Sequence, residues 1–163
     1  MTNYIKKTAK IAKLTSIETS IKGSSLYVDE DSVIDDFVKI KFVGGEGDIK
    51  IGKKVYLNSF TVLYSGNGIT IGDHVQIGPN CSLTPVNHAY KDKSKLIMEQ
   101  RFSTSKGGII IEDDVWISAG VTILDGSHIK KGAVIGANSL VNGVIEEYSI
   151  NFGVPCKCVG YRE

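Results

Sequence analysis

The three histidines are the side chains in this sequence best suited to acid–base chemistry. His88 differs from the others in its setting, because it stands where a regular sequence pattern stops and a long irregular segment begins. Neutral imidazole near pH 7 is the usual general base for taking a proton from a hydroxyl or an amine. His74 and His128 fall inside the regular pattern at outward-pointing positions, so we interpret them as solvated surface histidines. The sequence therefore singles out His88 as the candidate catalytic base.

Other catalytic arrangements do not compete with His88. The sequence holds no Gly-x-Ser-x-Gly elbow, no glycine-rich phosphate loop before a helix and no cluster of metal ligands. Cys156 and Cys158 have no second pair to complete a tetrahedral metal site, and Cys81 falls where a small buried residue is expected. Trp116, the only tryptophan, points outward in the pattern, and an exposed indole there needs a ligand or another chain as its partner.

A six-residue repeat must position these side chains. An aliphatic residue returns at every sixth position from Ile111 to Val141, and Val, Ser or Ala stands four residues after each one up to Ile135. Period six is neither the 3.6 of a helix nor the simple alternation of a half-buried strand. It is typical of a parallel β-helix, in which each hexad forms one flat side of a triangular coil. The sequence thus predicts an all-β fold whose stacked coils bury one continuous core.

Earlier hexads are interrupted once per turn of the coil. They begin at Val28, Ile34 and Ile40, at Ile51, Leu57 and Leu63, and at Ile71, Ile77 and Leu83. We therefore expect all insertions to leave the same edge of the prism. The longest insertion covers about residues 89–108. Its apolar residues favour an ordered loop that packs against a neighbouring subunit; they are Tyr90, Leu96, Ile97, Met98 and Phe102.

The chain is expected to form a single domain, 1–163, with a cap or arm over 1–27, the β-helix over 28–145 and a C-terminal segment over 146–163. Ile5, Ala9 and Ala12 would share one face of a short basic helix that touches a membrane surface, but we favour a cap or arm on the first coil. A net charge of +1 gives no reason to expect nucleic acid. Without an apolar membrane span or a signal-peptide pattern, a cytoplasmic protein is the default.

Together with several short motifs, the repeat resembles the left-handed β-helix acyltransferases built from hexapeptides. The galactoside/maltose, xenobiotic and surface-polysaccharide O-acetyltransferases are the most similar. The resemblance covers about residues 28–160, and its more specific motifs are Ile71-Gly-Asp with Ile77-Gly-Pro-Asn, Asn87-His88 before a loop, Asp114-Val-Trp-Ile117, Val134-Ile-Gly-Ala137 and Gly153-Val-Pro-Cys-Lys157. The family implies a left-handed coil, acetyl-CoA as co-substrate without a metal, and a homotrimer with active sites between subunits.

Roles for individual residues follow from the resemblance. In the family, the histidine matching His88 removes the proton of the acceptor hydroxyl, and the oxygen attacks the acetyl-CoA thioester directly. Substrate-binding roles are implied for Asn58, for Asn87 and for Trp116, which matches the tryptophan beside the thioester. The implied cofactor-binding residues line the CoA wall or lie near the CoA phosphates; besides Trp116 they are Ala119, Ala137, Asn142, Lys157 and Arg162.

The sequence also departs from the family pattern. Asn142-Gly143 stands where many members have Thr-Lys beside the adenine, and Ser118 replaces the usual glycine after Trp-Ile. Galactoside-type members carry acidic acceptor-binding residues near the position of Ser65, and this chain does not. The acceptor pocket is therefore expected to differ from that of the galactoside enzyme.

The sequence as a whole predicts a cytoplasmic, acetyl-CoA-dependent O-acetyltransferase acting on a sugar hydroxyl in surface-polysaccharide assembly. N-acetylation of an amino-sugar nucleotide and O-acetylation of a xenobiotic are alternatives within enzymes. Relatives of the former kind usually carry a nucleotide-binding domain, for which 163 residues leave no room. A non-catalytic β-helix scaffold is the alternative outside enzymes, and His88 beside a long loop argues against it.

Overall fold

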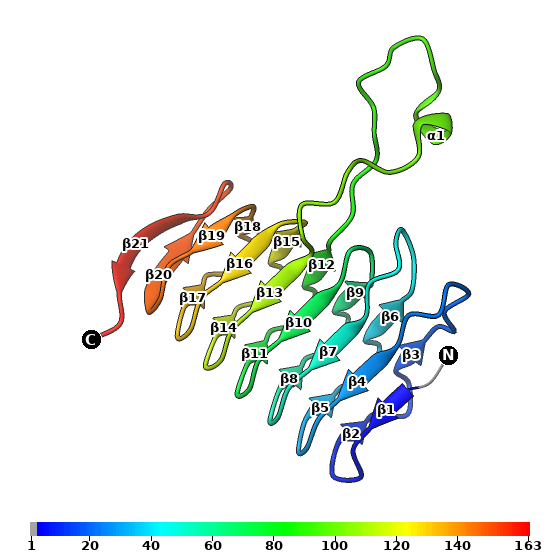
Figure 1. Ribbon diagram of the computed structural model, residues 1–163. Coiled ribbons are helices and arrows are strands. Elements are labelled where there is room, and N and C mark those ends of the chain that lie inside the picture. The colour runs from blue at the N-terminus through cyan, green and yellow to red at the C-terminus, as the bar shows by residue number, and fades with distance from the viewer. Residues whose placement is uncertain (1–2) are drawn as a thin grey trace.

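The structure is a computed structural model in which residues 3–163 are described; the first two residues of the expected N-terminal arm lie outside the described residues. Within that range every regular element is a β-strand except one helical turn, α1 (Ile97–Gln100). The strands follow one another in stacked coils and pair in parallel, and a long loop stands off the stack (Figure 1). The predicted all-β fold, a left-handed parallel β-helix with one protruding loop, is confirmed.

Each of the first six coils contributes one strand to each of three sheets, and the last coil contributes only to sheets A and B. Sheet A contains, in spatial order, β1 (Asn3–Ile5), β4 (Leu26–Val28), β7 (Ile49–Ile51), β10 (Ile69–Ile71), β13 (Ile109–Ile111), β16 (Ser127–Ile129) and β19 (Val144–Ile145). Sheet B contains β2 (Lys10–Ile11), β5 (Val33–Ile34), β8 (Tyr56–Leu57), β11 (Gln76–Ile77), β14 (Trp116–Ile117), β17 (Val134–Ile135), β20 (Ser149–Phe152) and β21 (Lys157–Tyr161). Sheet C contains β3 (Ser16–Ile17), β6 (Lys39–Lys41), β9 (Val62–Tyr64), β12 (Ser82–Thr84), β15 (Thr122–Leu124) and β18 (Leu140–Val141).

The core is a column of side chains inside the coils. The first and fifth positions of the hexads point inward, as Ile77 and Cys81 show with no exposed surface. Neighbouring coils are in register, so that Ile71 pairs with Ile51 on one side and Ile111 on the other. Full burial of such an aliphatic side chain contributes about 1.5–3 kcal/mol. The hexad register thus sets both the strand pairing and the core.

Two of the three edges of the prism are tight corners made by the fourth hexad position. At the A–B edge, between sheets A and B, the fourth-position residues with positive φ are Asp31, Lys54, His74, Asp114, Gly132 and Tyr148. At the B–C edge they are Phe37, Phe60, Asn80, Gly120 and Asn138. This left-handed conformation suits Gly and Asn and is unfavourable for bulky side chains. The chain turns at the same hexad position at both edges.

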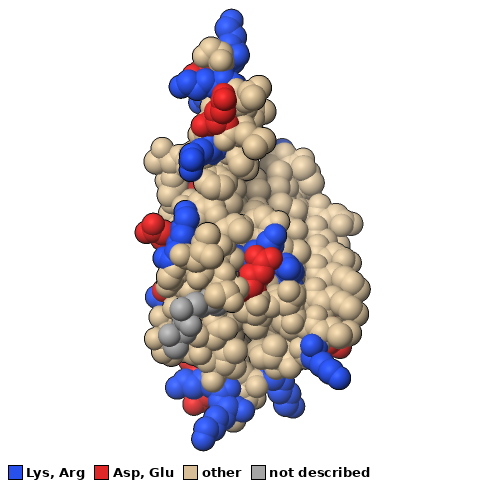
Figure 2. All heavy atoms as spheres, turned by 90° about the vertical axis from the view of Figure 1, so that its right-hand side faces the viewer, with Lys and Arg blue, Asp and Glu red and all other residues tan. Residues whose placement is uncertain are grey.

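The third edge, C–A, carries the insertions. Residues 43–48 lie between β6 and β7, residues 65–68 between β9 and β10, and the long loop between β12 and β13, so each leaves sheet C and returns to sheet A. The prediction that all insertions share one edge is confirmed. In Figure 2 the long loop rises clear of the body and carries charged side chains at its tip.

The β-helix begins earlier than the sequence pattern indicated. Strands β1, β2 and β3 pair in parallel with β4, β5 and β6, so residues 3–17 form a first coil rather than a separate cap or arm. The helical interpretation of this segment is therefore wrong. Its physical pattern is again a hexad, because Ile5, Ile11 and Ile17 are six residues apart. The expected start at Val28 is too late by one coil.

The C-terminal end also extends the coil. β20 continues sheet B by pairing in parallel with β17 at Ile150 and Asn151, beyond the expected limit at residue 145. The chain then reverses, and β21 pairs antiparallel with β20. Sheet B therefore ends in a hairpin that covers the last parallel strand. In the part of the chain that the structure describes, no helix is long and apolar enough to span a membrane.

Candidate active site

His88 lies at the neck of the long loop, at the C–A edge of the fourth coil. The two arms of the loop meet there in an antiparallel bridge between His88 and Phe102. The backbone amide of Ala89 donates to the carbonyl of Arg101 (3.0 Å), and that of Ser103 donates to the carbonyl of Asn87 (2.8 Å). The backbone that carries His88 is therefore held by hydrogen bonds on both sides.

The imidazole of His88 is exposed and packs against one aromatic ring. Its centroid lies 4.9 Å from that of Phe102, with the planes inclined by 41°. Within residues 3–163 no hydrogen bond to the imidazole is formed, so both ring nitrogens remain available. The ring faces an open hollow of about 770 Å³ whose lining includes Asn87, Tyr90 and Lys106. An available imidazole at the mouth of a hollow is what a general base for an incoming substrate requires.

The returning arm of the loop is fixed by a buried carboxylate that the sequence pattern did not single out. Asp125, only 2% exposed, follows β15 at the C–A edge. Its Oδ2 accepts from the backbone amide of Lys106 (2.8 Å) and from Nδ2 of Asn67 (3.1 Å), and its Oδ1 accepts from the amide of Gly108 (2.9 Å). Asp125 thus ties the foot of the loop to two other coils.

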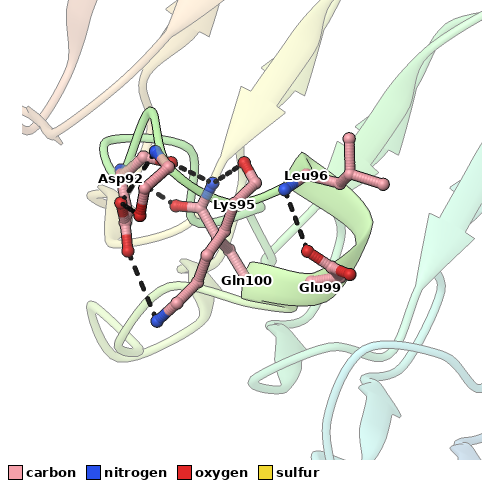
Figure 3. A network of polar contacts seen from close by, with 6 residues as sticks. Asp92, Lys95, Leu96, Glu99 and Gln100 are labelled. Atoms are coloured by element: carbon pink, nitrogen blue, oxygen red, sulfur yellow. Dashed lines mark hydrogen bonds and ion pairs between the residues drawn. The ribbon is translucent and has the colours of Figure 1, made fainter.

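The tip of the loop is ordered by its own polar contacts (Figure 3). Oδ1 of Asp92 accepts from the amide (3.0 Å) and the hydroxyl (2.6 Å) of Ser94, and Lys95 forms an ion pair with Asp92 (3.3 Å). Nε2 of Gln100 donates to the carbonyls of Asp92 and Lys95, and Glu99 accepts from the amide of Leu96. The loop is therefore ordered.

The apolar side chains of the loop remain largely exposed within the chain: Tyr90, Leu96, Ile97, Met98 and Phe102. Apart from Phe102, which contacts His88, these apolar side chains are mostly exposed within residues 3–163.

Trp116 lies in sheet B, and Asn58 directly follows one of the strands of that sheet. Trp116 is 54% exposed and stands on the outer face of β14, between Gln76 and Val134 of the neighbouring strands. Asn58 follows β8 at the B–C edge, where its Nδ2 donates to the carbonyl of Ile77 (2.8 Å). The outward orientation expected for Trp116 is confirmed. Within one chain, however, Trp116 and Asn58 lie on a different face from His88. The hollow beside Trp116 is lined by His74 and not by His88.

The remaining expected cofactor-binding residues are divided among the edges. Ala119 and Ala137 follow β14 and β17 at the B–C edge, on consecutive coils. Asn142 is exposed at the C–A edge, and Lys157 is exposed on β21. The two alanines therefore lie beside sheet B, which carries Trp116, and at the same edge as Asn58. Asn142 lies at the other edge of sheet C.

Arg162 is engaged within its own chain. Its Nη1 donates to Oδ2 of Asp114 (2.9 Å) and to the carbonyl of Gly132 (2.9 Å), and the guanidinium lies 5.8 Å from the ring centre of Tyr148. These contacts anchor the C-terminal hairpin to the A–B edge. Arg162 lines the hollow of about 390 Å³ that also contains Trp116. It is thus near the tryptophan but at the other edge of sheet B from the alanines.

Comparisons with known proteins agree with this architecture. The profile described as bacterial transferase hexapeptide (six repeats) matches residues 108–143. The galactoside O-acetyltransferase of Lactococcus lactis is 33% identical over 112 residues, which are 69% of this chain and 52% of the relative. The putative lipopolysaccharide biosynthesis O-acetyl transferase of Escherichia coli is 31% identical over 71% of this chain and 61% of its own. Residues 108–143 thus match the hexapeptide repeat of bacterial transferases, and the chain is similar to O-acetyltransferases over about two thirds of its length.

Two further similar proteins bear on the site. The dTDP-4-amino-4,6-dideoxy-D-glucose acyltransferase of Escherichia coli is 26% identical over 155 residues, 90% of this chain and 80% of that protein. The hexapeptide-repeat acetyltransferase of Vibrio cholerae, solved with acetyl-CoA, superposes with a TM-score of 0.69 at 29% identity, over 81% of this chain and 69% of that one. The chain spans about half the length of several curated relatives that it matches.

The other two histidines of the chain have local surroundings of their own. His74 is exposed at the A–B edge in the left-handed conformation. Nε2 of His128 lies 2.7 Å from Oε1 of Glu112 on the outer face of sheet A. The backbone amide of Lys131 and, secondarily, His128 hold the pKa of Glu112 below its ordinary value. Among residues 3–163 no three His, Cys, Asp or Glu side chains are grouped as a metal site.

Proposed function

We propose that this chain transfers an acetyl group from acetyl-CoA to a hydroxyl of a sugar, in the modification of a surface polysaccharide, and that His88 is the general base. The observation that carries the proposal is the setting of His88. It is exposed at the braced neck of an ordered loop, with no hydrogen-bond partner in residues 3–163, and it faces a hollow large enough for a substrate. The names of the relatives support acyl transfer to sugar-related acceptors.

The proposed reaction is a direct transfer. A ring nitrogen of His88 takes the proton of the acceptor hydroxyl while the hydroxyl oxygen attacks the thioester carbonyl carbon, forming the C–O bond. The C–S bond then breaks, and the sulfur leaving group takes the proton back from the imidazolium. The products are the acetyl ester and free CoA thiol, so the base is regenerated in each turnover.

We further propose that the active site is completed by a second copy of the chain within a homotrimer. Trp116, Asn58, Ala119 and Ala137 lie on sheet B or its B–C edge, whereas Asn87 and His88 lie at the C–A edge. From β9 onward the outward residues of sheet C are uncharged: Val62, Tyr64, Ser82, Thr84, Thr122, Leu124 and Leu140. An uncharged face and a loop with exposed apolar residues are suited to contact between copies.

In this arrangement the B–C edge of one subunit would form the CoA wall. The small side chains of Ala119 and Ala137 leave the backbone of consecutive coils accessible to the pantetheine chain, and Trp116 would border the thioester end. Lys157 is exposed and available to a phosphate. Arg162 would reach CoA only if its ion pair with Asp114 rearranged. A cytoplasmic location accords with the supply of the donor.

N-acylation of a nucleotide-linked amino sugar is the second candidate function. The relative named for such an acceptor aligns with 155 residues of this chain and is covered over 80% of its own length. Chain length therefore does not argue against this class of acceptor, contrary to the expectation from the sequence. No feature of the site favours O-acetylation of a xenobiotic or a non-catalytic scaffold over these two functions.

Acceptor screening tests the proposed function. The purified protein is incubated with acetyl-CoA and a panel of methyl glycosides, amino sugars and dTDP-linked amino sugars, and free thiol is followed. We expect thiol release to depend on a sugar that carries a free hydroxyl, with an acetyl ester in the product. Release only with amino sugars would replace the O-acetyl assignment by the second candidate. Absence of release with every acceptor would contradict both.

Binding of the donor is read out separately by Trp116. Because it is the only tryptophan and is 54% exposed, indole fluorescence reports on one place on sheet B. Addition of CoA should change the intensity or the emission maximum in a saturable way. If calorimetry detects CoA binding while the emission stays constant, Trp116 does not line the donor site.

A further inference from the structure

The hollow that contains His88 is lined by two lysines from opposite arms of the long loop. Lys91 lies on the outgoing arm and Lys106 on the returning arm, and both line the hollow of about 770 Å³. They belong to a basic segment, because residues 89–108 contain five basic and two acidic side chains while the net charge of the whole chain is +1. In Figure 2 basic side chains prevail on the part of the loop that rises clear of the body. The loop therefore concentrates positive charge beside the candidate base.

These two lysines are not paired with acidic side chains of the described residues. Asp92 also lines the hollow, but its Oδ1 accepts from the amide and the hydroxyl of Ser94, and Lys95 forms an ion pair with its Oδ2 (3.3 Å). Neither Lys91 nor Lys106 forms an ion pair within residues 3–163. Two ammonium groups without an ion-pair partner therefore border a hollow that is open to a ligand.

Lys106 is held in place by its surroundings. Its backbone amide donates to Oδ2 of Asp125 (2.8 Å). Its side chain lies over Gly126, because a Cβ on that glycine would lie 2.7 Å from Cβ and 3.5 Å from Cδ of Lys106. The carboxylate of Asp125 is buried and binds amide groups, so it fixes the backbone of Lys106 and leaves the ammonium group unpaired. A lysine whose backbone and stem are already fixed loses less freedom when it binds a ligand.

Lys91 stands next to a second fixed point of the loop. The backbone amide of Asp92 donates to Oε1 of Gln100 (3.1 Å), and Nε2 of Gln100 donates to the carbonyl of Asp92 (2.9 Å) (Figure 3). These two hydrogen bonds hold the outgoing arm beside α1, while the bridge between His88 and Phe102 closes the neck of the loop. The backbone that carries Lys91 is therefore held on both sides.

We propose that Lys106 and Lys91 bind an anionic group of the acceptor, a carboxylate or a phosphate, so that the protein acetylates an acidic saccharide. An ammonium group donates up to three hydrogen bonds, and those to an ionised acceptor are about twice as strong as those between neutral groups. A neutral sugar offers these donors no such partner. The inference rests on the proposed function and adds to it the charge of the acceptor and two residues that select it.

The phosphates of CoA fit this place less well than the acceptor does. In CoA the whole pantetheine arm separates the thioester from the phosphates, and the proposed reaction places the thioester beside His88. A cation that shares one hollow with the base is therefore close to the acceptor rather than to the far end of the donor. The same lining contains Asn87 and Thr104, whose side chains form no hydrogen bond within residues 3–163. They are available to the hydroxyls of the sugar.

The test offers one hexose in three forms: the neutral methyl glycoside, the methyl glycoside of the uronic acid, and the glycosyl 1-phosphate. Lys106→Met and Lys91→Met keep an unbranched stem and remove the charge, whereas Lys106→Arg keeps the charge. Lys93→Met is the matched control, because Lys93 is exposed on the same loop but does not line the hollow. The readouts, from thiol release, are KM and kcat for each acceptor and KM for acetyl-CoA.

In the wild-type protein one of the anionic forms should have a KM about tenfold below that of the neutral glycoside. Which form it is distinguishes recognition of a carboxylate from recognition of a phosphate. Lys106→Met and Lys91→Met should each raise that KM about tenfold, while KM for the neutral glycoside and for acetyl-CoA stays at the wild-type value. Lys106→Arg and Lys93→Met should behave like wild type.

Three results would overturn the inference. Equal KM values for the neutral and anionic forms in the wild type would show that charge is not recognised. A higher KM for acetyl-CoA in the methionine variants would assign the lysines to the donor. An equal loss of kcat with all three acceptors would assign them to the reacting atoms. Lack of turnover by the wild-type protein with any saccharide contradicts the proposed function itself, and the inference falls with it.

Discussion

The imidazole of His88 rests against the ring of Phe102, with centroids 4.9 Å apart, and the same two residues form the antiparallel bridge that closes the neck of the loop. Phe102 therefore holds the backbone of His88 through the bridge and limits the rotation of its imidazole through the ring contact. Since no hydrogen bond to the imidazole occurs within residues 3–163, Phe102 is the group that defines the ring's orientation.

Removal of this ring should impair catalysis more than folding. Phe102→Ala is expected to lower kcat about tenfold, because a base that samples several orientations is correctly placed for less of the time. KM for acetyl-CoA and the melting temperature should stay near wild type. Phe102→Tyr, which keeps the ring, serves as the control. Equal loss of kcat in both variants would show that the aromatic contact does not orient the base.

Asp125 is expected to hold the loop in place for His88. Asp125→Asn replaces one acceptor oxygen by a donor that faces a backbone amide, and hydrogen bonds to a charged acceptor contribute about 1.5–3 kcal/mol each. Cleavage within residues 89–108 by a protease should become faster and kcat should fall, while the melting temperature of the β-helix changes little.

Asp113→Asn is the matched control for this prediction. Oδ1 of Asp113 also accepts from a backbone amide, that of Asp73 (2.7 Å), but at the A–B edge. It should leave cleavage of the loop unchanged. If Asp125→Asn leaves both cleavage and kcat at wild-type values, the buried carboxylate does not position the loop.

Much of the fold could be predicted from the sequence because the hexad is a local signal. Each inward Ile, Leu or Val marks one side of a coil, and the gaps after Lys41, Tyr64 and Thr84 mark one edge. The first coil was not predicted. Its inward residues Ile5, Ile11 and Ile17 are separated by lysines, and an insertion follows them before β4, so the segment also fits an amphipathic helix. A six-residue count started at Ile5 finds it.

The site was less accessible to sequence reasoning for a physical reason. His88 could be singled out because it follows the end of a regular run of hexads. Phe102 contacts His88, and Asp125 binds the foot of the loop, only through residues far apart in the sequence. Asp125 sits inside an unbroken hexad, where nothing in the spacing shows that its carboxylate is buried. How copies of the chain combine is also not encoded in a local pattern.

The inward register of the core is tested by the same substitution at two isoleucines. Ile123 is fully buried between Leu83 and Val141, whereas Ile110 is 42% exposed on the outer face of sheet A. Ile123→Asp places a charge in the core at a cost of several kcal/mol and should give insoluble or unfolded protein. Ile110→Asp should remain soluble and folded. A stable, soluble Ile123→Asp protein would mean that this residue does not face inward.

The stability of the β-helix should depend on pH through Glu112. The amide of Lys131 and, to a lesser extent, His128 hold the pKa of this carboxyl below its ordinary value of about 4.5. The resulting stabilisation is complete above that value and is lost as the pH falls through the lower pKa of the folded state. The drop in melting temperature between pH 6 and pH 3 should therefore be smaller in Glu112→Gln than in wild type. Glu147→Gln is the control. An identical drop in melting temperature in all three proteins would exclude a contribution of Glu112.

Turnover by His88→Ala tests the central claim most directly. With the acceptor that wild type uses best, the rate of thiol release from acetyl-CoA should fall by about 10²–10⁴, because the group that removes the hydroxyl proton is gone. CoA binding measured by calorimetry, the sedimentation coefficient and the melting temperature should match wild type, which separates loss of the base from loss of the fold. Thiol release near the wild-type rate in this variant would contradict the assignment of His88 as the general base.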